Sequence, residues 1–451
     1  MRDAASVSQF GPAQGSVLIR GARVLGAEPQ DLLVTDGLIA EVGAPGAVEA
    51  PEDARVIDAE GLIALPGFVD LHVHLREPGK EAAETVLTGT QAAAKGGFTA
   101  VFAMANSTPV ADSAGVVEQV YTAARAAGWA EVRPVGAVTK GLAGEQLADL
   151  GAMADSTAAV RMFSDDGMCV HDAAIMRRAL EYVKAFDGFV AQHAQEPRLT
   201  EGAQMNEGDV SATLGLVGWP AVAEEAVIAR DVLLADHVSS RLHVCHVSTA
   251  GSVEVIRWAK SRGINVTAEV TPHHLLLTDE LVESFNPVYK VNPPLRTRKD
   301  VEALRQAVAD GVIDVIGTDH APHTENTKSC EWTQAAMGMT GLETALSVVV
   351  KTLVETGLIG WDRLAEIMST TPARIGGLAD QGQSLAVGSP ANITLVDPEA
   401  SRTVDASAMA TKGRNSPFHG MELPARVVAT LFHGHPTVLD GELATAHPAA
   451  R

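Results

Sequence analysis

The stretch "FVDLHVHLREPG" contains two histidines one residue apart, His72 and His74, whose type and spacing suit metal binding. An apolar run precedes them, and similar runs elsewhere also end in imidazole or carboxylate side chains. Those further side chains are Asp166, His193, His246 and Asp319. Local hydrogen bonding explains a lone histidine pair, but not this many such groups at equivalent places. Imidazoles and carboxylates are typical zinc ligands, and a catalytic zinc ion keeps one position for water. The sequence therefore predicts a zinc site.

The first of these segments also has a periodicity of two. Because side chains alternate across a β-strand, His72, His74 and Arg76 are expected on one face. Leu71 and Val73 are expected on the opposite face. The alternation thus directs a cation toward the pocket that holds the two histidines.

Parity narrows the choice of ligand in two other segments. In "RLHVCHVST", His243 and His246 have opposite parity, so a regular strand sends only one of them inward. His246 lies nearer the end of the run and is the expected ligand. In "FSDDG", parity leaves both Asp165 and Asp166 open.

Length, composition and charge bound the class of protein. The chain has 451 residues, of which 46% are hydrophobic, so it can bury a large core. A formal net charge of −22 argues against nucleic acid or anionic membrane surfaces as partners. Three cysteines form no disulfide framework, and no apolar stretch reaches membrane-spanning length. We therefore expect a soluble cytoplasmic protein.

The elements that must position these residues form a repeating pattern in the middle of the chain. Short apolar runs alternate with alanine-rich, helix-compatible segments, which predicts a (β/α)8 barrel of the TIM type. The active site of such a barrel lies where its strands end. The runs are "GFVDLHVH", "FTAVFAMAN", "VRPVGAVTK", "AAVRMFSDDG", "GFVAQHAQE", "RLHVCHVST", "INVTAEVTPHH" and "VIDVIGTDHAPH".

Both ends of the chain read differently from the middle. Segments such as "SVLIRGARVLG" and "ARVVATLFHG" alternate, are rich in β-branched residues and are separated by glycines. We predict an α/β protein in which residues 66–380 form the barrel. Residues 1–65 and 381–451 together form a small β-sandwich domain.

Several motifs together resemble the dihydroorotases, a branch of the amidohydrolase superfamily. "DLHVHLREPG" is similar to their first signature and "GTDHAPHTENTK" to their second. "FSDDG", "CHVST", "KVNPPLR" and "GSPANITLVD" also have family counterparts, so the resemblance covers almost the whole chain. It implies two zinc ions per subunit. One ion is held by His72, His74 and Asp319 and the other by His193 and His246, with Asp166 bridging them or joining the set.

One position distinguishes this chain from amidohydrolases with related functions. In related hydantoinases and allantoinases a carboxylated lysine on the fourth strand bridges the metals. "AVRMFSDDG" has no lysine, and Arg161 stays protonated and does not carboxylate under ordinary conditions. This difference favours the dihydroorotase type.

The reaction implied is the reversible cyclisation of N-carbamoyl-L-aspartate to L-dihydroorotate plus water, in the de novo synthesis of UMP. Asp319 is the expected general acid and base. Arg76, Asn106 and His323 are expected to bind the substrate carboxylate, which a guanidinium can grip with two hydrogen bonds. Asn292 is expected to contact the ring.

Two alternatives remain open. One is another cyclic amidohydrolase, such as a hydantoinase, dihydropyrimidinase or allantoinase. The other is a catalytically inactive scaffold for aspartate transcarbamoylase. An active enzyme is further expected to form a homodimer, and association with aspartate transcarbamoylase is compatible with activity.

Overall fold

The computed structural model describes residues 15–444, and most of them form a closed barrel of parallel strands. Hydrogen bonds join β6, β7 and β8 in one sheet and β9, β10, β13, β14 and β15 in another. Two bridges, Gly136 to Phe163 and Val73 to His320, close the ring. Each strand overlaps one of the apolar runs predicted from the sequence, although β8 begins one residue before its run, at Glu131. The strands are β6 (Phe68–Val73), β7 (Phe98–Ala103), β8 (Glu131–Pro134), β9 (Met162–Phe163), β10 (Phe189–Gln192), β13 (Leu242–Val244), β14 (Val266–Val270) and β15 (Val315–Ile316).

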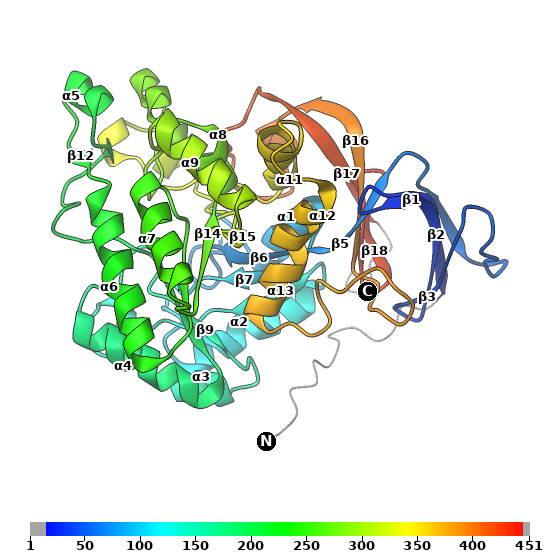
Figure 1. Ribbon diagram of the computed structural model, residues 1–451, viewed down its shortest axis with the longest axis horizontal. Helices are drawn as coiled ribbons and strands as arrows, with labels where there is room; N and C mark the ends of the chain where they lie inside the picture. Colours follow the sequence, from blue (N-terminus) through cyan, green and yellow to red (C-terminus); the bar gives the residue numbers. More distant parts are fainter. Residues whose placement is uncertain (1–14, 445–451) are drawn as a thin grey trace.

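Helices follow the strands along the chain and cover the outside of the barrel (Figure 1). Their apolar faces meet outward-facing strand residues, as Val120 and Val132 do within one apolar cluster. Thr85, Asp172 and Thr249 begin three of the helices by accepting backbone N–H bonds of the first turn. The helices are α1 (Val86–Lys95), α2 (Ala114–Ala127), α3 (Leu150–Asp155), α4 (Ala173–Val183), α6 (Val222–Val238), α7 (Ala250–Ser261), α9 (Arg298–Ala309), α11 (Ala345–Val349), α12 (Trp361–Ala365) and α13 (Thr371–Gly376).

Shorter elements lie in the connections at the carboxyl ends of the strands. A small two-stranded sheet and a helix follow β10, and single helical turns follow β14 and β15. They are β11 (Met205–Asn206), α5 (Asp209–Leu214), β12 (Gly218–Trp219), α8 (Pro272–Leu276) and α10 (Glu325–Lys328).

A second apolar cluster fills the interior of the barrel. It contains Leu71 and Phe102 from the first two strands together with Ile375 and Leu378 from α13 and the turn after it. The close approach needs a glycine, because a Cβ at Gly376 would lie 2.4 Å from the Phe102 ring. The segment around α13 therefore closes the end of the barrel where the strands begin.

Both ends of the chain build the second domain, as the sequence predicted. Within residues 15–444 its sheet has nine strands, and β16 pairs antiparallel with β5, so that Ile393 lies opposite Pro66. Its own apolar core includes Ile19, Leu32 and Leu431. In Figure 1 the blue N-terminal and red C-terminal strands lie together beside the barrel. They are β1 (Ser16–Val24), β2 (Pro29–Thr35), β3 (Leu38–Gly43), β4 (Arg55–Asp58), β5 (Ile63–Pro66), β16 (Ile393–Thr403), β17 (Glu422–Phe432), β18 (His435–Leu439) and β19 (Glu442–Leu443).

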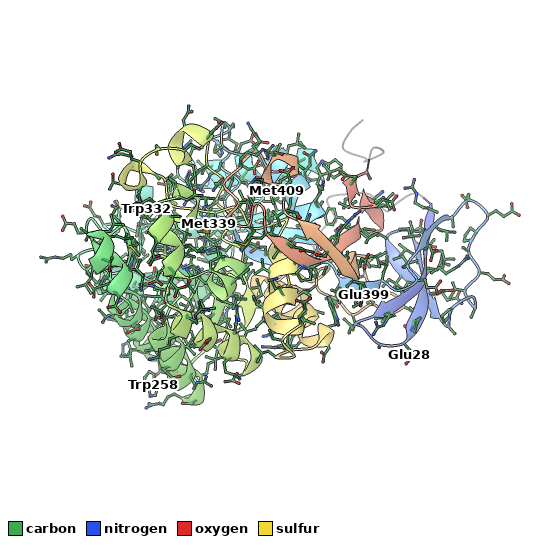
Figure 2. All side chains as sticks on the ribbon, turned by 90° about the horizontal axis from the view of Figure 1, so that it is seen from above. Glu28, Trp258, Trp332, Met339, Glu399 and Met409 are labelled. Carbon is green, nitrogen blue, oxygen red and sulfur yellow. The ribbon has the colours of Figure 1, made fainter. Side chains whose placement is uncertain are left out.

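Seen from above, the two domains lie end to end along the long axis of the molecule. Glu28 lies in the β-domain, whereas Trp258 and Trp332 lie in the barrel (Figure 2). None of the helices between residues 15 and 444 combines the length and apolar character needed to cross a membrane.

Candidate metal and substrate site

A bulge in β6 positions the first two histidines. The pairing with β7 shifts between Asp70 and Val73, so strict alternation stops there. Leu71 lies in the interior cluster and Val73 in the outer one, so the prediction that they share a face is wrong. The bulge nevertheless places Leu71 and the next residue, His72, on the same inward side. Alternation resumes after His72, so Val73 points outward and His74 inward.

Asp166, after β9, lies at the centre of the predicted ligands. Its Oδ1 is 3.3 Å from His72 Nε2, and its Oδ2 is 3.4 Å from His74 Nε2. The same Oδ1 is 3.5 Å from His193 Nδ1 and 3.5 Å from His246 Nε2. Ligand atoms of two triplets, each of which includes Asp166, lie within 4.8 Å of one another. One carboxylate thus touches all four imidazoles.

The neighbouring Asp165 has a different environment. Its Oδ1 accepts hydrogen bonds from the backbone N–H groups of Val138 and Thr139 at 2.8 and 2.9 Å, and the Thr139 hydroxyl donates to its Oδ2. These bonds use the carboxylate to hold the loop after β8. The structure therefore separates the two aspartates that parity left open.

Asp319, after β15, lies against the first histidine pair. Its Oδ1 is 2.9 Å from His74 Nε2 and 3.5 Å from His72 Nε2. Its φ is +47°, in the left-handed region that side chains seldom adopt. Arg76 and His246 share this feature, with φ of +61° and +29°. Such backbone strain gathers at functional sites.

The structure corrects the parity argument for β13. The strand ends at Val244, and the left-handed backbone at His246 turns its side chain back toward the barrel axis. His243 also points inward, because its ring meets Phe189 and its Nε2 is 3.2 Å from Glu269 Oε2. Both histidines are therefore inside, His243 deeper in the barrel and His246 at the metal-ligand cluster.

Glu269, on β14, is a buried residue that sequence reasoning missed. His72 Nδ1–H donates to its Oε1 at 2.6 Å, and the backbone N–H of His246 donates to the same oxygen at 3.1 Å. A carboxylate in the buried run "NVTAEVTP" was the available signal, because a charge there needs a partner. The bond to Glu269 fixes the His72 ring so that its Nε2 faces Asp166.

The outer nitrogens of two other histidines are also occupied. His74 Nδ1–H donates to Asn106 Oδ1 at 2.9 Å, and His193 Nε2–H donates to Gln195 Oε1 at 2.8 Å. Metal-binding histidines usually donate the second nitrogen to such an acceptor, which fixes the tautomer. The nitrogens that remain, His72 Nε2 among them, point at Asp166, and His72 Nε2 has no hydrogen-bond partner within residues 15–444.

The electrostatics of the cluster favour a cation at its centre. Burial alone would lower the pKa of His72, but Asp166 and Glu269 raise it well above its ordinary value. Burial opposes ionisation of Asp166, yet His72 and the other histidines hold its pKa well below its ordinary value. The donor set and this field both fit a divalent metal ion.

A cavity of about 210 Å³ opens beside the cluster, and it is lined by every residue predicted to bind substrate. These residues are Arg76, Asn106, Asn292 and His323. Arg76 Nε donates to the Pro322 carbonyl at 3.1 Å. The two terminal nitrogens of that guanidinium have no partner among the described residues. The cavity thus places a cationic fork across from Asp166 and Asp319.

His323 and Asn292 are held by their neighbours in the cavity wall. His323 Nε2–H donates to the Met337 carbonyl at 2.8 Å, and burial, with Arg76 next, lowers the pKa of His323 to about 3. Asn292 Nδ2 donates to Gln195 Oε1 at 3.1 Å, and its own Oδ1 is buried without a partner in residues 15–444. Both are neutral polar groups.

The β-domain segment after β16 supports this wall, which the sequence did not indicate. Asn415 Oδ1 accepts the backbone N–H of His323 at 3.0 Å, and its Nδ2 donates to the carbonyls of Ala321 and Gly338 at 2.9 and 3.1 Å. One amide therefore fixes both sides of the loop that carries His323.

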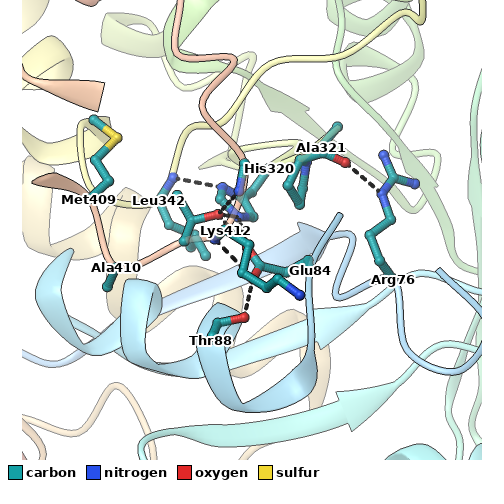
Figure 3. A network of polar contacts seen from close by, with 12 residues as sticks. Arg76, Glu84, Thr88, His320, Ala321, Leu342, Met409, Ala410 and Lys412 are labelled. Carbon is teal, nitrogen blue, oxygen red and sulfur yellow. Dashed lines mark hydrogen bonds and ion pairs between the residues drawn. The ribbon is translucent and has the colours of Figure 1, made fainter. Parts of the chain in front are cut away.

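Figure 3 shows a second buried link between the barrel and the C-terminal segment. Glu84, after β6, accepts the hydroxyls of Thr88 and Thr411 and the backbone N–H of Lys412. Its Oε2 is also 3.4 Å from Nε2 of His320, the residue after Asp319. This network joins the loops after the first and eighth strands to the C-terminal segment.

Comparison with known proteins agrees with this geometry. The sequence model of the family described as "Dihydro-orotase-like" matches residues 61–252. The dihydroorotase of Streptomyces coelicolor is 65% identical, and the match covers 94% of this chain and 99% of that one. The dihydroorotase of Mycobacterium tuberculosis is 56% identical, with 95% and 99% covered. This chain belongs to the dihydroorotase family. The family resemblance read from the motifs is confirmed, and with it the classification as a hydrolase of cyclic amides.

Solved structures confirm the fold. L-hydantoinase from Arthrobacter aurescens superimposes with a TM-score of 0.84 at 26% identity, covering 95% of this chain and 97% of that one. Dihydropyrimidinase from Brevibacillus agri gives a TM-score of 0.83 at 25% identity, covering 96% and 97%. The predicted barrel with a β-sandwich domain is therefore correct.

Proposed function

We propose that this chain is a zinc-dependent dihydroorotase with two zinc ions per subunit. It interconverts N-carbamoyl-L-aspartate and L-dihydroorotate plus water, in the de novo synthesis of UMP. The observation that carries the proposal is one carboxylate, Asp166, in contact with four imidazoles beside a cavity that contains Arg76. In this proposal His72, His74 and Asp319 would hold one ion and His193 and His246 the other, and Asp166, which contacts all four imidazoles, would bridge the ions or join the set.

Zinc, when bound, supplies Lewis acidity and lowers the pKa of its water. The chain's own groups supply the remaining steps. Asp319 lines the cavity, and the neighbouring histidines, His72 first, lower its pKa to about 2 against the effect of burial. An ionised Asp319 acts as general base toward the attacking water. Its protonated form then delivers that proton to the ring nitrogen that leaves.

Arg76 provides the specificity in this proposal. Its two free terminal nitrogens grip the carboxylate of dihydroorotate, a bidentate contact that a neutral ring cannot make. Asn106 and His323 line the same wall and complete the carboxylate site, and Asn292 contacts the ring. An uncharged substrate would leave the Arg76 guanidinium buried without a partner, which costs binding energy.

The competing functions are less well supported. Related hydantoinases have a bridging lysine on the fourth strand, and Arg161 is the nearest candidate for that position in this chain. Arg161 instead donates to the carbonyls of Ala154 and Val160, away from the ligand cluster. That placement disfavours a hydantoinase-type metal bridge. An inactive scaffold has no use for an intact ligand set. The homodimer, the cytoplasmic location, the association with aspartate transcarbamoylase and the domain limits at residues 65/66 and 380/381 stay predictions.

Hydrolysis of L-dihydroorotate by the zinc-loaded full chain, followed by loss of its ultraviolet absorbance, tests the proposal. Turnover should disappear on chelation and return with zinc. A folded, zinc-containing protein that ignores dihydroorotate but hydrolyses hydantoin or dihydrouracil would support the first alternative. A folded protein that binds no zinc would support the scaffold.

A further inference from the structure

A second cavity, of about 580 Å³, lies at the opposite end of the barrel, where the strands begin. Glu131 and Phe189 are the first residues of β8 and β10, and Arg161 and Arg241 immediately precede β9 and β13. His433, between β17 and β18, completes one side. The cavity therefore lies between the barrel and the β-domain, and its volume suits a small-molecule ligand.

The floor of this cavity is apolar and buried. Phe102, Phe189, Ile375 and Leu378 line it, and all four belong to the cluster that fills the barrel interior. Apolar floors of this kind bind the uncharged part of a ligand, while a few polar groups fix its orientation.

The rim of the cavity carries four arginines, which is unusual in a chain of net charge −22. They are Arg125, Arg133, Arg161 and Arg241. Within residues 15–444, Arg125 makes no hydrogen bond or ion pair, and its guanidinium lies 6.0 Å from the Tyr121 ring. Arg161 uses only Nη1, for two backbone carbonyls at 2.9 Å. Neither guanidinium has a carboxylate partner in that part of the chain.

The carboxylates that line the same cavity are fewer than the arginines, so the lining has an excess of positive charge. Glu131 accepts from Arg133 Nε at 2.6 Å and from Gln381 at 3.0 Å, so it is fully engaged. Asp187 accepts from Arg241 at 3.1 Å. Asp380 lies 3.7 Å from His433. Among the described residues that line the cavity, four guanidinium groups thus face three carboxylates, and only Asp380 Oδ1 of these carboxylates is buried without a hydrogen-bond partner.

We propose that this cavity binds an organic phosphate of nucleotide size. The phosphate lies between Arg125 and Arg161, whose free donors form charge-assisted hydrogen bonds with its oxygens, and the uncharged part lies on the apolar floor. A guanidinium recognises phosphate through paired donors. The local excess of positive charge at the rim attracts a dianion even though the chain as a whole is negative. The site is separate from the catalytic cavity and does not depend on the proposed function.

Calorimetric titration of the zinc-loaded full chain tests this proposal, with uridine 5′-monophosphate as probe and uridine and inorganic phosphate as comparisons. The nucleotide should bind at one per chain and more tightly than either comparison. Arg125→Glu should raise its Kd by about tenfold or more, because a donor pair and a charge are lost. Arg161→Met should weaken binding similarly, and added salt should weaken it in the unaltered chain.

Arg262→Glu is a matched control. Like Arg125, Arg262 lies at a helix end and over an aromatic ring, that of Trp258 at 5.6 Å. This variant carries the same charge change outside the cavity and should bind the nucleotide normally. Arg76→Met, in the catalytic cavity, should also leave nucleotide binding unchanged.

Three results would overturn the proposal. The first is no binding of the nucleotide at millimolar concentration. The second is binding that Arg76→Met removes and Arg125→Glu does not, which would place the nucleotide in the catalytic cavity. The third is inorganic phosphate binding as tightly as the nucleotide, which would leave the apolar floor without a role. Arg125 is exposed, so its variant should fold even if the Arg161 variant does not.

Discussion

Two groups of buried polar side chains, the metal-ligand cluster at one end of the barrel and the network around Glu131 at the other, differ in how completely they are paired. At the catalytic end, His72 Nε2, His273 Nε2 and Asn292 Oδ1 have no hydrogen-bond partner within residues 15–444. At the opposite end, Glu131 accepts from Arg133 and Gln381, and Gln381 in turn accepts from Thr99. A buried polar group without a partner is costly, so its persistence indicates a ligand, whereas a closed network indicates support of the fold.

The largest effect expected from breaking this contrast comes from the adjacent aspartates. Asp166→Ala removes the carboxylate between four imidazoles and should reduce kcat/KM by at least about 10³-fold, with loss of bound zinc. Asp165→Ala removes only hydrogen bonds to Val138 and Thr139. It should lower the free energy of unfolding by about 1–3 kcal/mol and retain zinc. Metal analysis and steady-state kinetics distinguish the two, and equal zinc loss in both variants would contradict the assignment.

Arg76 provides the next largest effect. Arg76→Met should reduce kcat/KM for L-dihydroorotate by about 10²-fold, because a charge-assisted, two-point contact is lost. Arg76→Lys keeps the charge but loses the two-point contact, so its kcat/KM should lie between those of the unaltered chain and Arg76→Met. Zinc content should stay normal in both variants. Unchanged kinetics in Arg76→Met would remove Arg76 from the substrate site.

Substitution of Glu269 tests whether this buried carboxylate supports zinc binding by positioning the ligand His72. Glu269→Gln weakens the acceptor for His72 and should reduce zinc affinity by about 10- to 100-fold. Thr267→Val is the control, because it removes the other partner of His243, 2.8 Å from its Nδ1, and leaves His72 untouched. Competition with a zinc chelator measures both. Equal affinities would mean that Glu269 serves only the fold.

The sequence predicted the barrel well because parallel strands buried on both faces read as short apolar runs. Each of these runs overlaps a strand, and the polar residues after the strands meet at one end of the barrel. The route by which they meet was less predictable. The bulge between Asp70 and Val73 and the left-handed backbone at His246 depend on hydrogen bonds to neighbouring strands, which alternation in one segment does not encode.

Supporting residues were harder to find than the proposed ligands. Glu269 lies in an otherwise apolar run, and its partner His72 is 197 residues away in sequence. Asn415 supports the substrate wall from the other domain, in a segment without a distinctive motif. A carboxylate in the buried run indicated that Glu269 has a partner, but residue type and spacing did not identify that partner, because such contacts arise from the packing of distant segments.

Glu131 at the opposite end should affect stability but not catalysis. Glu131→Ala leaves the Arg133 guanidinium and the Gln381 amide without their acceptor and should lower the free energy of unfolding by about 1–3 kcal/mol. The kcat/KM should not change, because the catalytic cavity lies at the other end of the barrel. Glu131→Gln keeps an acceptor and should cost less. A loss of activity without a loss of stability would break the contrast between the two ends.

Lys328, in α10, tests how the stability of the fold depends on pH. Its Nζ donates to the carbonyls of Lys290 and Ala336 at 2.7 and 2.8 Å, and burial, with Lys290 next, lowers its pKa from 10.5 to about 7. Between pH 7 and 10.5 the Lys328 amine therefore carries a proton in the unfolded chain but has released it in the folded chain. The free energy of unfolding should therefore rise with pH from about 7 to 10.5, by at most about 1.4 kcal/mol per pH unit, and should not change below 7 on this account. Denaturant unfolding at pH 7 and 9, at constant zinc content, measures the rise. Lys328→Met should reduce it, and the exposed Lys351→Met should not; an unchanged rise in the Lys328 variant would show that other groups cause it.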